Sequence, residues 1–231
     1  MRGRHRHWQD DLVPIQQSDS HKKIYQPGRP PDPGIEARVI DAALEIYAEV
    51  GWAGFTIDAV TRKSRVGKAA IYRRWPTRQE LVAAAIRSLR VQASDELGIN
   101  LRQDLLIVAQ TYAHRYLGRH GLAYLRAQVE AKVYPDVLGE ALEDIRADTI
   151  SRGRSLVHRA IERGELPPDT STALIMDAVA GSIVNRILLV PPGGLAELNE
   201  RAPEFSERIV DFVLAAVGWK AVPKRRRPAR D

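Results

Sequence analysis

The sequence of 231 residues contains no cysteine and no run of 18 consecutive apolar residues. The first absence excludes disulfides, a thiol nucleophile and cysteine-based zinc sites. The second argues against a membrane-spanning helix, and the basic, polar start of the chain does not resemble a secretory leader. We therefore expect a cytoplasmic protein that does not engage a membrane.

Motifs of common enzyme classes are also lacking. The sequence has no G-x-S-x-G, H-E-x-x-H, P-loop or G-x-G-x-x-G pattern, and no spacing of carboxylates and histidines stands out as catalytic. His5 and His7 lie close together, but no further clustered ligands accompany them. These absences disfavour an enzyme, so we expect no catalytic residue, no metal and no cofactor.

The sequence does contain a local concentration of positive charge. The formal net charge is +6, yet residues 62–78 alone carry +7, whereas residues 35–61 and 79–219 each carry −4. Tyr72 and Trp75 are interleaved with these cations. A basic segment on an acidic body is typical of proteins that bind a polyanion. A charge run can equally be a solvated face, so charge alone leaves both interpretations open.

The same stretch carries a helix-turn-helix pattern. Thr56 is a candidate N-cap for one short helix, residues 64–66 supply a turn, and a second helix begins near Gly67. Two short helices joined by a tight turn are typical of DNA-binding domains. Positive charge on this pattern favours DNA binding over a solvated face.

Residues 38–81, roughly a fifth of the chain, resemble the N-terminal domain of TetR-family (tetracycline-repressor-like) transcription regulators. The resemblance implies an all-α protein, with an N-terminal three-helix helix-turn-helix domain joined by a fourth helix to a C-terminal helical domain that binds a ligand and dimerises. It involves many positions in the family's order: residues 40–44, Gly51, Phe55, Thr56, Val60, Thr61, residues 66–68, residues 71–75 and residues 77–81.

The second short helix has the composition of a recognition helix. Gly67 and Ala69 keep its leading surface small, which allows a close approach to the bases. Lys68 is the first candidate for a base contact, since it can donate to guanine, and Arg73 is the second. The resemblance adds contacts to the DNA backbone at three positions: Thr56, Tyr72 and Arg78.

The sequence departs from the family pattern at three places. Arg65 stands where the turn usually has glycine, Gly67 where serine usually caps the recognition helix, and Ala70 where threonine is common. If the turn needs a positive φ, Arg65 costs roughly 1 kcal/mol unless it contributes a phosphate contact. These departures affect the preferred operator sequence rather than the fold.

Four segments follow from the patterns along the chain. Residues 1–34 are expected to be a flexible basic arm, in which Lys22, Lys23 and Arg29 are candidates for contacts in the minor groove. Residues 35–80 form the DNA-binding domain, residues 81–219 the helical body, and residues 220–231 a basic tail. Helical patterns are expected at residues 36–50, 77–89, 100–119, 121–133, 135–163 and 203–217, and a further one begins at Asp169 or Ser171 and runs to residue 190.

The last two predicted helices are apolar on most sides and must therefore be buried on most sides. A homodimer through these helices is the simple solution, and a monomer that buries both in its own core is the alternative. The candidate interface comprises Ile183, Ile187, Phe205, Ile209, Phe212 and Ala216.

Regulation by a small molecule is implied by the family resemblance. We expect a repressor that binds a palindromic double-stranded operator as a dimer and is released by a small, largely apolar effector. A helical adaptor that binds protein through its basic domain is the alternative. Polar groups of an effector pocket are candidates at Tyr112, Tyr116, Tyr124, Gln128 and Asn185.

Overall fold

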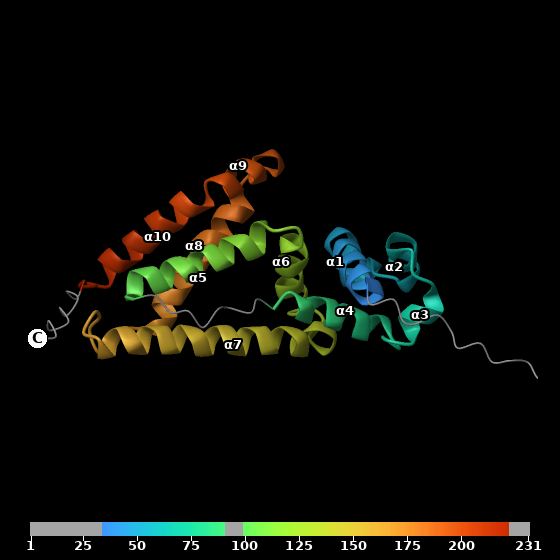
Figure 1. Cartoon of the computed structure of the whole chain (residues 1–231), viewed down its shortest axis with the longest axis horizontal. Coiled ribbons are helices and arrows are strands. Elements are labelled where there is room, and N and C mark those ends of the chain that lie inside the picture. Colours follow the sequence, from blue (N-terminus) through green and yellow to red (C-terminus); the bar gives the residue numbers. More distant parts are fainter. Residues whose placement is uncertain (1–33, 91–98, 222–231) are drawn as a thin grey trace, which may run out of the picture. The chain divides into compact units, whose positions relative to one another are not determined.

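The computed structural model describes residues 34–90 and 99–221, and within these ranges it contains helices and no strands. Figure 1 shows their order along the chain. The elements are α1 (Gly34–Gly54), α2 (Ile57–Ser64), α3 (Lys68–Tyr72), α4 (Arg78–Ser88), α5 (Leu101–Leu117), α6 (Gly121–Glu130), α7 (Pro135–Glu162), α8 (Thr172–Leu189), the 3₁₀ helix η1 (Pro192–Gly194), α9 (Leu195–Glu200) and α10 (Ala202–Ala216). The all-α prediction is confirmed. We call α1–α4 the head and α5–α10 the body.

Four helices begin where the sequence places an N-cap. The side-chain oxygens of Thr56, Thr77, Asn100 and Ser171 each accept a hydrogen bond from the backbone N–H three residues later, at 3.0–3.3 Å. Each bond satisfies one of the donors that a helix leaves unpaired in its first turn. These helix starts are therefore set by local chemistry, as predicted.

The end of α1 differs from the prediction. The sequence predicts that Gly51 ends the first helix, but this residue forms a kink with φ 65°, after which one more helical turn runs to Gly54. Trp52 and Phe55 follow the kink and are buried in the core. The kink turns these two aromatic side chains into the head.

One apolar core holds the head together and continues into the body. Its fully buried members include Val39, Tyr47, Phe55, Ile71 and Leu81 from α1–α4 and the loops between them. The cluster also includes residues of the body: Tyr116, Ala123, Tyr124, Ala127, Leu138, Ala141 and Ile145. Helix α4 packs against both α1 and α7, so it joins the two parts as predicted.

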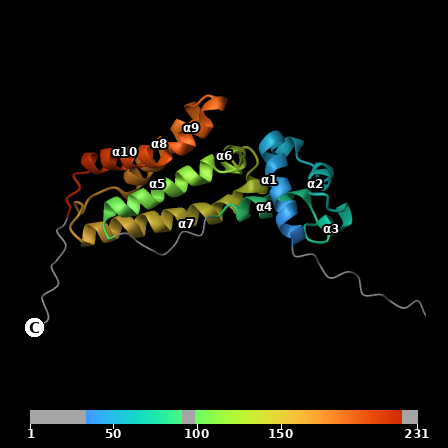
Figure 2. The same cartoon turned by 45° about the horizontal axis from the view of Figure 1, so that its top comes forward.

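A second core lies among α5, α7, α8 and α10. Leu105, Val157, Ile175 and Val210 are completely buried in it. Helix α5 packs against both α8 and α10, and Figure 2 shows these helices from a second direction. Short α9, which the sequence patterns did not predict, connects η1 to α10.

Helix α8 is less buried than its composition predicts. Only Ile175, Val179 and Ile183 of its residues are buried, so the core of the single chain does not cover this helix on most sides. By length and composition this helix could span a membrane. Instead, its buried face packs in the second core, and an apolar outer face remains exposed.

Candidate nucleic-acid interface

The turn between α2 and α3 depends on an unusual backbone conformation. Arg65 has φ 55° and ψ 30°, and it is the one non-glycine residue with a positive φ among those described. The Oγ of buried Ser64 accepts a hydrogen bond from the N–H of Val66 at 3.3 Å, which closes the turn. The turn therefore does need a positive φ at Arg65, the condition under which the sequence predicts a strained residue. The Arg65 side chain is exposed.

Helix α3 presents a small outer surface. Ile71 is completely buried and anchors the helix, whereas Gly67, Lys68, Ala69 and Tyr72 are exposed. A Cβ at Gly67 would meet no atom within 4 Å, so packing within the chain does not require glycine there. The regular helix ends at Tyr72, and exposed Arg73 follows it.

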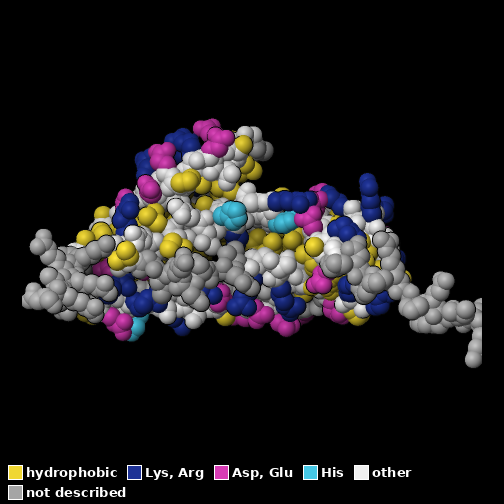
Figure 3. Space-filling model, in the orientation of Figure 1, with side chains coloured by type: hydrophobic (Ala, Val, Ile, Leu, Met, Phe, Trp, Pro, Cys, Tyr) yellow, Lys and Arg dark blue, Asp and Glu magenta, His cyan; other side chains and the backbone are white. Residues whose placement is uncertain are grey.

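Two lysines near this surface are paired with acids of the same chain. The Nζ of Lys68 lies 2.8 Å from Oδ1 of Asp58, and the Nζ of Lys63 lies 2.7 Å from Oε2 of Glu45. The hydrogen bond from Lys68 lowers the pKa of Asp58, and the same contact raises the pKa of Lys68. These two lysines therefore have acidic neighbours, and Figure 3 shows basic and acidic side chains intermixed on the visible face of the molecule.

Arg78 combines two contacts at the start of α4. Its Nη1 donates a hydrogen bond to the carbonyl oxygen of Phe55 at 3.0 Å, and its guanidinium carbon lies 4.1 Å from the centre of the Trp52 ring. The residue next to Phe55 is Thr56, the exposed N-cap of α2. These contacts bring Thr56 and Arg78, two of the three residues predicted to contact the DNA backbone, to neighbouring positions, and Arg78 remains exposed.

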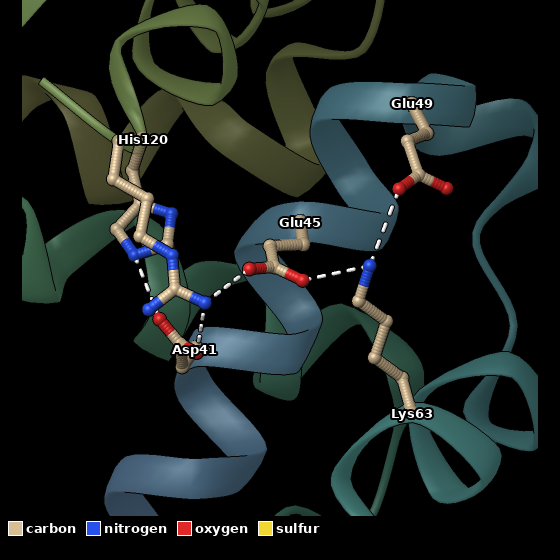
Figure 4. A network of polar contacts seen from close by, with 6 residues as sticks. Asp41, Glu45, Glu49, Lys63 and His120 are labelled. Carbon is tan, nitrogen blue, oxygen red and sulfur yellow. Dashed lines mark hydrogen bonds and ion pairs between the residues drawn. The ribbon is translucent and has the colours of Figure 1, made fainter.

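A polar network connects the body to the head (Figure 4). His120, in the turn before α6, lies 2.9 Å from Asp41 of α1, and Arg119 contacts both Asp41 and Glu45. Glu45 also pairs with Lys63 of α2. Each exposed ion pair contributes little alone. The series nevertheless joins the α5–α6 turn, α1 and the first helix of the helix-turn-helix.

Glu130, the last residue of α6, makes a second connection. Its Oε2 accepts hydrogen bonds from the Tyr47 hydroxyl at 2.9 Å and from the Trp52 backbone N–H at 2.8 Å. The Gly51 kink frees that N–H from the regular helical pattern. Sequence patterns missed Glu130 and the Arg119–His120 pair because their partners are distant in the chain and no local motif marks them. They missed Asp58 because its contact with Lys68 depends on the turn between α2 and α3.

The predicted effector residues are partly brought together. Tyr116 stacks on Tyr112, packs against Tyr124 and accepts a hydrogen bond from the Gln128 side chain at 2.7 Å. Tyr116 and Tyr124 are buried in the first core. Asn185 is exposed on α8. A shallow cavity of about 210 Å³ lies instead among η1, α9 and the ends of α8 and α10, lined by Arg186, Leu198, Arg201, Phe205 and Arg208, among others.

The predicted dimer residues divide into two groups. Ile183 is 1% exposed in the chain's own core, so it is not on the surface as the interface prediction requires. Phe212 is 71% exposed, Ala216 is exposed, and Phe205, Ile209 and Ile187 are half-buried. Helices α8 and α10 therefore retain an exposed apolar face without Ile183. Lys22, Lys23, Arg29 and residues 222–231 lie outside the described residues.

The geometry of α2 and α3 defines the head as a helix-turn-helix DNA-binding domain. A turn anchored by buried Ser64 and Val66 presents a short helix whose outer surface is small and basic, as insertion into the major groove requires. Residues 39–85 match the model for bacterial regulatory proteins of the tetR family, and residues 99–213 match the tetracyclin repressor-like C-terminal domain.

Relatives extend this agreement over most of the chain. An uncharacterised helix-turn-helix-type transcriptional regulator of Mycobacterium tuberculosis is 31% identical over 169 residues, which cover 70% of this chain and 82% of the relative. The DNA-binding transcriptional repressor TetR of Mycobacteroides abscessus is 28% identical over 77% of this chain and 90% of its own. The chain belongs to the TetR family, and the protein is a DNA-binding transcriptional regulator.

Solved structures share the fold. The ketosteroid transcriptional regulator KstR2 of Mycobacterium tuberculosis has a TM-score of 0.60 at 16% identity and covers 81% of this chain and 95% of its own. FadR from Bacillus subtilis, in complex with stearoyl-CoA, has a TM-score of 0.60 at 14% identity. The match covers 78% of this chain and 98% of the FadR chain. Both structures therefore share the fold over most of their own length.

Proposed function

We propose that the protein is a cytoplasmic repressor that binds a palindromic operator as a homodimer and releases it when a small effector binds the body. The observation that carries this proposal is the double connection between body and head. Glu130 joins α6 to α1, and the Arg119–His120 pair joins the preceding turn to the same helix. A change in the position of α6 would therefore act directly on the head.

Effector binding at the tyrosine cluster would move α6. Tyr124 and Gln128 belong to α6, whereas Tyr112 and Tyr116 belong to α5. A ligand inserted between these side chains must separate the two helices, because Tyr116 and Tyr124 are in contact with ring centres 5.3 Å apart. The surroundings are mostly apolar, which suits a largely apolar effector, and one structural relative holds stearoyl-CoA.

A dimer would place two recognition helices at the spacing that a palindromic operator requires. Recognition helices on a palindrome must enter successive major grooves about 34–36 Å apart. The exposed apolar face of α8 and α10 is suited to a second copy of the chain, since a second α8–α10 pair would complete a four-helix interface. An effector that favours another spacing of the heads would lower operator affinity by the same factor by which DNA lowers effector affinity.

The proposal is tested by selecting bound sequences from random duplex DNA and then screening compounds for release. We expect a palindromic sequence whose binding survives competitor DNA but weakens steeply as salt rises. Released complexes should show the compound bound to the body. Binding that prefers no duplex, together with capture of an unchanged protein partner at high salt, would favour the adaptor interpretation and end the repressor proposal.

The base-reading assignment has its own test. Lys68→Ala should relax the preference at one or two base pairs, because each good base contact contributes about 1–3 kcal/mol of discrimination. Tyr72→Phe should instead weaken binding to all sequences, since it removes a phosphate contact. An equal loss for every sequence with Lys68→Ala would remove that residue from base recognition.

A further inference from the structure

The ion pair between Asp58 and Lys68 places an acid on the surface predicted to face DNA. Asp58 is in the first turn of α2, two residues after the N-cap Thr56, and Lys68 is the first residue of α3. Their side chains are 62% and 51% exposed, and their charged atoms are 2.8 Å apart. A phosphate that approaches Lys68 therefore meets the Asp58 carboxylate at almost the same position.

We propose that Asp58 is a specificity-determining residue, which holds Lys68 back from non-specific phosphate contacts and orients it for a base. This inference rests on the proposed role of Lys68 at the operator. A lysine that stays paired with Asp58 releases no counterion from DNA, so it adds little to non-specific affinity. An ammonium group has three donors, so Lys68 can keep Asp58 and still donate to guanine.

The Asp58 carboxylate should affect a Lys68 contact to phosphate differently from a Lys68 contact to guanine. On unrelated DNA, a contact from Lys68 to phosphate brings the phosphate close to the Asp58 carboxylate, and like charges repel. On the operator, guanine O6 and N7 are neutral acceptors, so the same carboxylate causes less repulsion and helps to fix the direction of the lysine. Asp58 should therefore lower non-specific affinity more than operator affinity.

A purely structural role for Asp58 is the simple alternative. A carboxylate in the first turn of a helix is stabilised by the partial positive charge of the N-terminus, and Arg62 also contributes to the lowered pKa of Asp58. This role predicts a lower melting temperature for the variant and the same change in affinity for every duplex. Only the ratio between operator and non-specific affinity separates the two roles.

Glu49 provides a matched control. It is an exposed acid of the head, with 60% of its side chain accessible, and it pairs with Lys63 at 3.3 Å. Glu49→Gln therefore makes the same change in net charge as Asp58→Asn, but Lys63 keeps its second acidic partner, Glu45. Affinity gained merely because the head becomes more positive would be the same in both variants.

The experiment measures the affinity of the full chain for the selected operator and for a scrambled duplex over a series of salt concentrations. Asp58→Asn should raise affinity for the scrambled duplex about three- to tenfold at low salt and steepen its salt dependence by about one phosphate contact, with a smaller rise for the operator. Glu49→Gln should change the ratio by less than about twofold. In a Lys68→Ala background, Asp58→Asn should leave the ratio unchanged.

Each alternative outcome has a definite meaning. An unchanged ratio with Asp58→Asn, or a change equal to that of Glu49→Gln, would overturn the inference while the regulator proposal stands. A change in ratio that persists in the Lys68→Ala background would show that Asp58 acts without Lys68, which also contradicts it. If no preferred duplex emerges from selection, the proposed operator binding itself fails and the inference with it.

Discussion

At the scale of single residues, Arg65 combines an unfavourable conformation with an exposed cation. A left-handed backbone costs a residue with a side chain roughly 1–2 kcal/mol relative to glycine. Arg65 forms no ion pair with any described residue, so its guanidinium is available to a phosphate. The residue is thus unfavourable for the turn and favourable for a DNA contact.

Arg65→Gly should separate the strain in the turn from the contribution of the Arg65 side chain to DNA binding. We expect the free energy of unfolding to rise by up to about 1 kcal/mol, because glycine adopts positive φ without strain. DNA affinity should fall, with the salt dependence reduced by about one phosphate contact. Urea unfolding and binding titrations measure the two quantities.

Arg65→Asn is the control for the lost charge, since asparagine tolerates the left-handed region better than most residues. It should lose the same DNA affinity as the glycine variant with a smaller gain in stability. Undiminished DNA affinity in both variants would show that Arg65 faces solvent in the complex.

A side chain at Gly51 should be poorly tolerated. Its φ is 65°, and a Cβ there would lie 2.2 Å from Oε1 of Glu130. Gly51→Ala should lower the free energy of unfolding by about 2–4 kcal/mol, because it adds backbone strain and displaces the acceptor of the Tyr47 and Trp52 hydrogen bonds. Denaturant unfolding monitored by circular dichroism measures the loss.

Gly139→Ala is the matched control on α7, where the nearest side-chain atom to an added Cβ is at 4.0 Å. That variant should gain about 0.5–1 kcal/mol, as expected for alanine in a helix interior. Equal stability of the two alanine variants would contradict the proposed conflict with Glu130.

At the scale of elements, Glu165 ties three segments together. It follows α7 and is buried, and its Oε2 accepts hydrogen bonds from the Leu101 N–H at 2.7 Å and from the Trp219 indole N–H at 3.0 Å. Burial by itself raises the pKa of Glu165, but the hydrogen bonds from Trp219, Leu101 and Arg163 outweigh it and the pKa is lowered. The carboxylate thus joins the start of α5 to the segment after α10.

This lowered pKa predicts a pH dependence of stability. A carboxyl group with a depressed pKa in the folded state contributes stability that is present above its unfolded pKa, about 4.3, and is lost as pH falls through the folded value. Below about pH 4.3 the free energy of unfolding should therefore decrease, and Glu165→Gln should show a shallower decrease from a lower starting value. Urea unfolding at a series of pH values from about 3 to about 7 measures both slopes.

Asp211→Asn is the control, because the pKa of Asp211 is also lowered, chiefly by Arg102, but the pair is exposed. Its effect on the slope should be smaller than that of Glu165→Gln, as exposed pairs contribute about 0–1 kcal/mol. If the free energy of unfolding changes with pH equally in the two variants, burial does not make the Glu165 carboxylate more stabilising than the exposed Asp211.

Sequence patterns predicted the elements better than the contacts between them. The caps at Thr56, Thr77 and Asn100 involve partners three residues away, so local chemistry fixes them. The bond from Trp52 to Glu130 spans 78 residues, and no periodicity or motif announces such a pair. Helical spacing was enough to predict that the DNA-binding candidates on α3 are exposed. The pairing of Lys68 with Asp58 could not be predicted in this way, because it depends on the turn that folds α3 against α2.

At the scale of the whole molecule, α8 and α10 leave large apolar side chains exposed in the single chain. Leu174 and Leu188 of α8 are exposed, and so is Phe212 of α10. Large apolar faces of this kind usually mark an interaction surface. A bilayer could also cover α8, but the polar and charged residues of α10, including Asp211 beside Phe212, disfavour that environment.

Phe212→Asp should therefore produce monomers in sedimentation experiments. A charge at the centre of an apolar interface costs several kcal/mol unless it finds a partner. The variant should also lose operator affinity while it retains non-specific affinity, because each head still binds phosphate but the two heads are no longer linked at the half-site spacing.

Ile150→Asp is the control on α7, at an apolar residue that is also exposed but lies outside the proposed interface. It should leave both the mass and the operator affinity unchanged. A dimeric Phe212→Asp variant would place the interface elsewhere, whereas a monomer that still discriminates its operator fully would show that one head carries the specificity. Because Ile183 already packs within the chain, the interface has to form from the outer face alone, so Phe212 should dominate its energy.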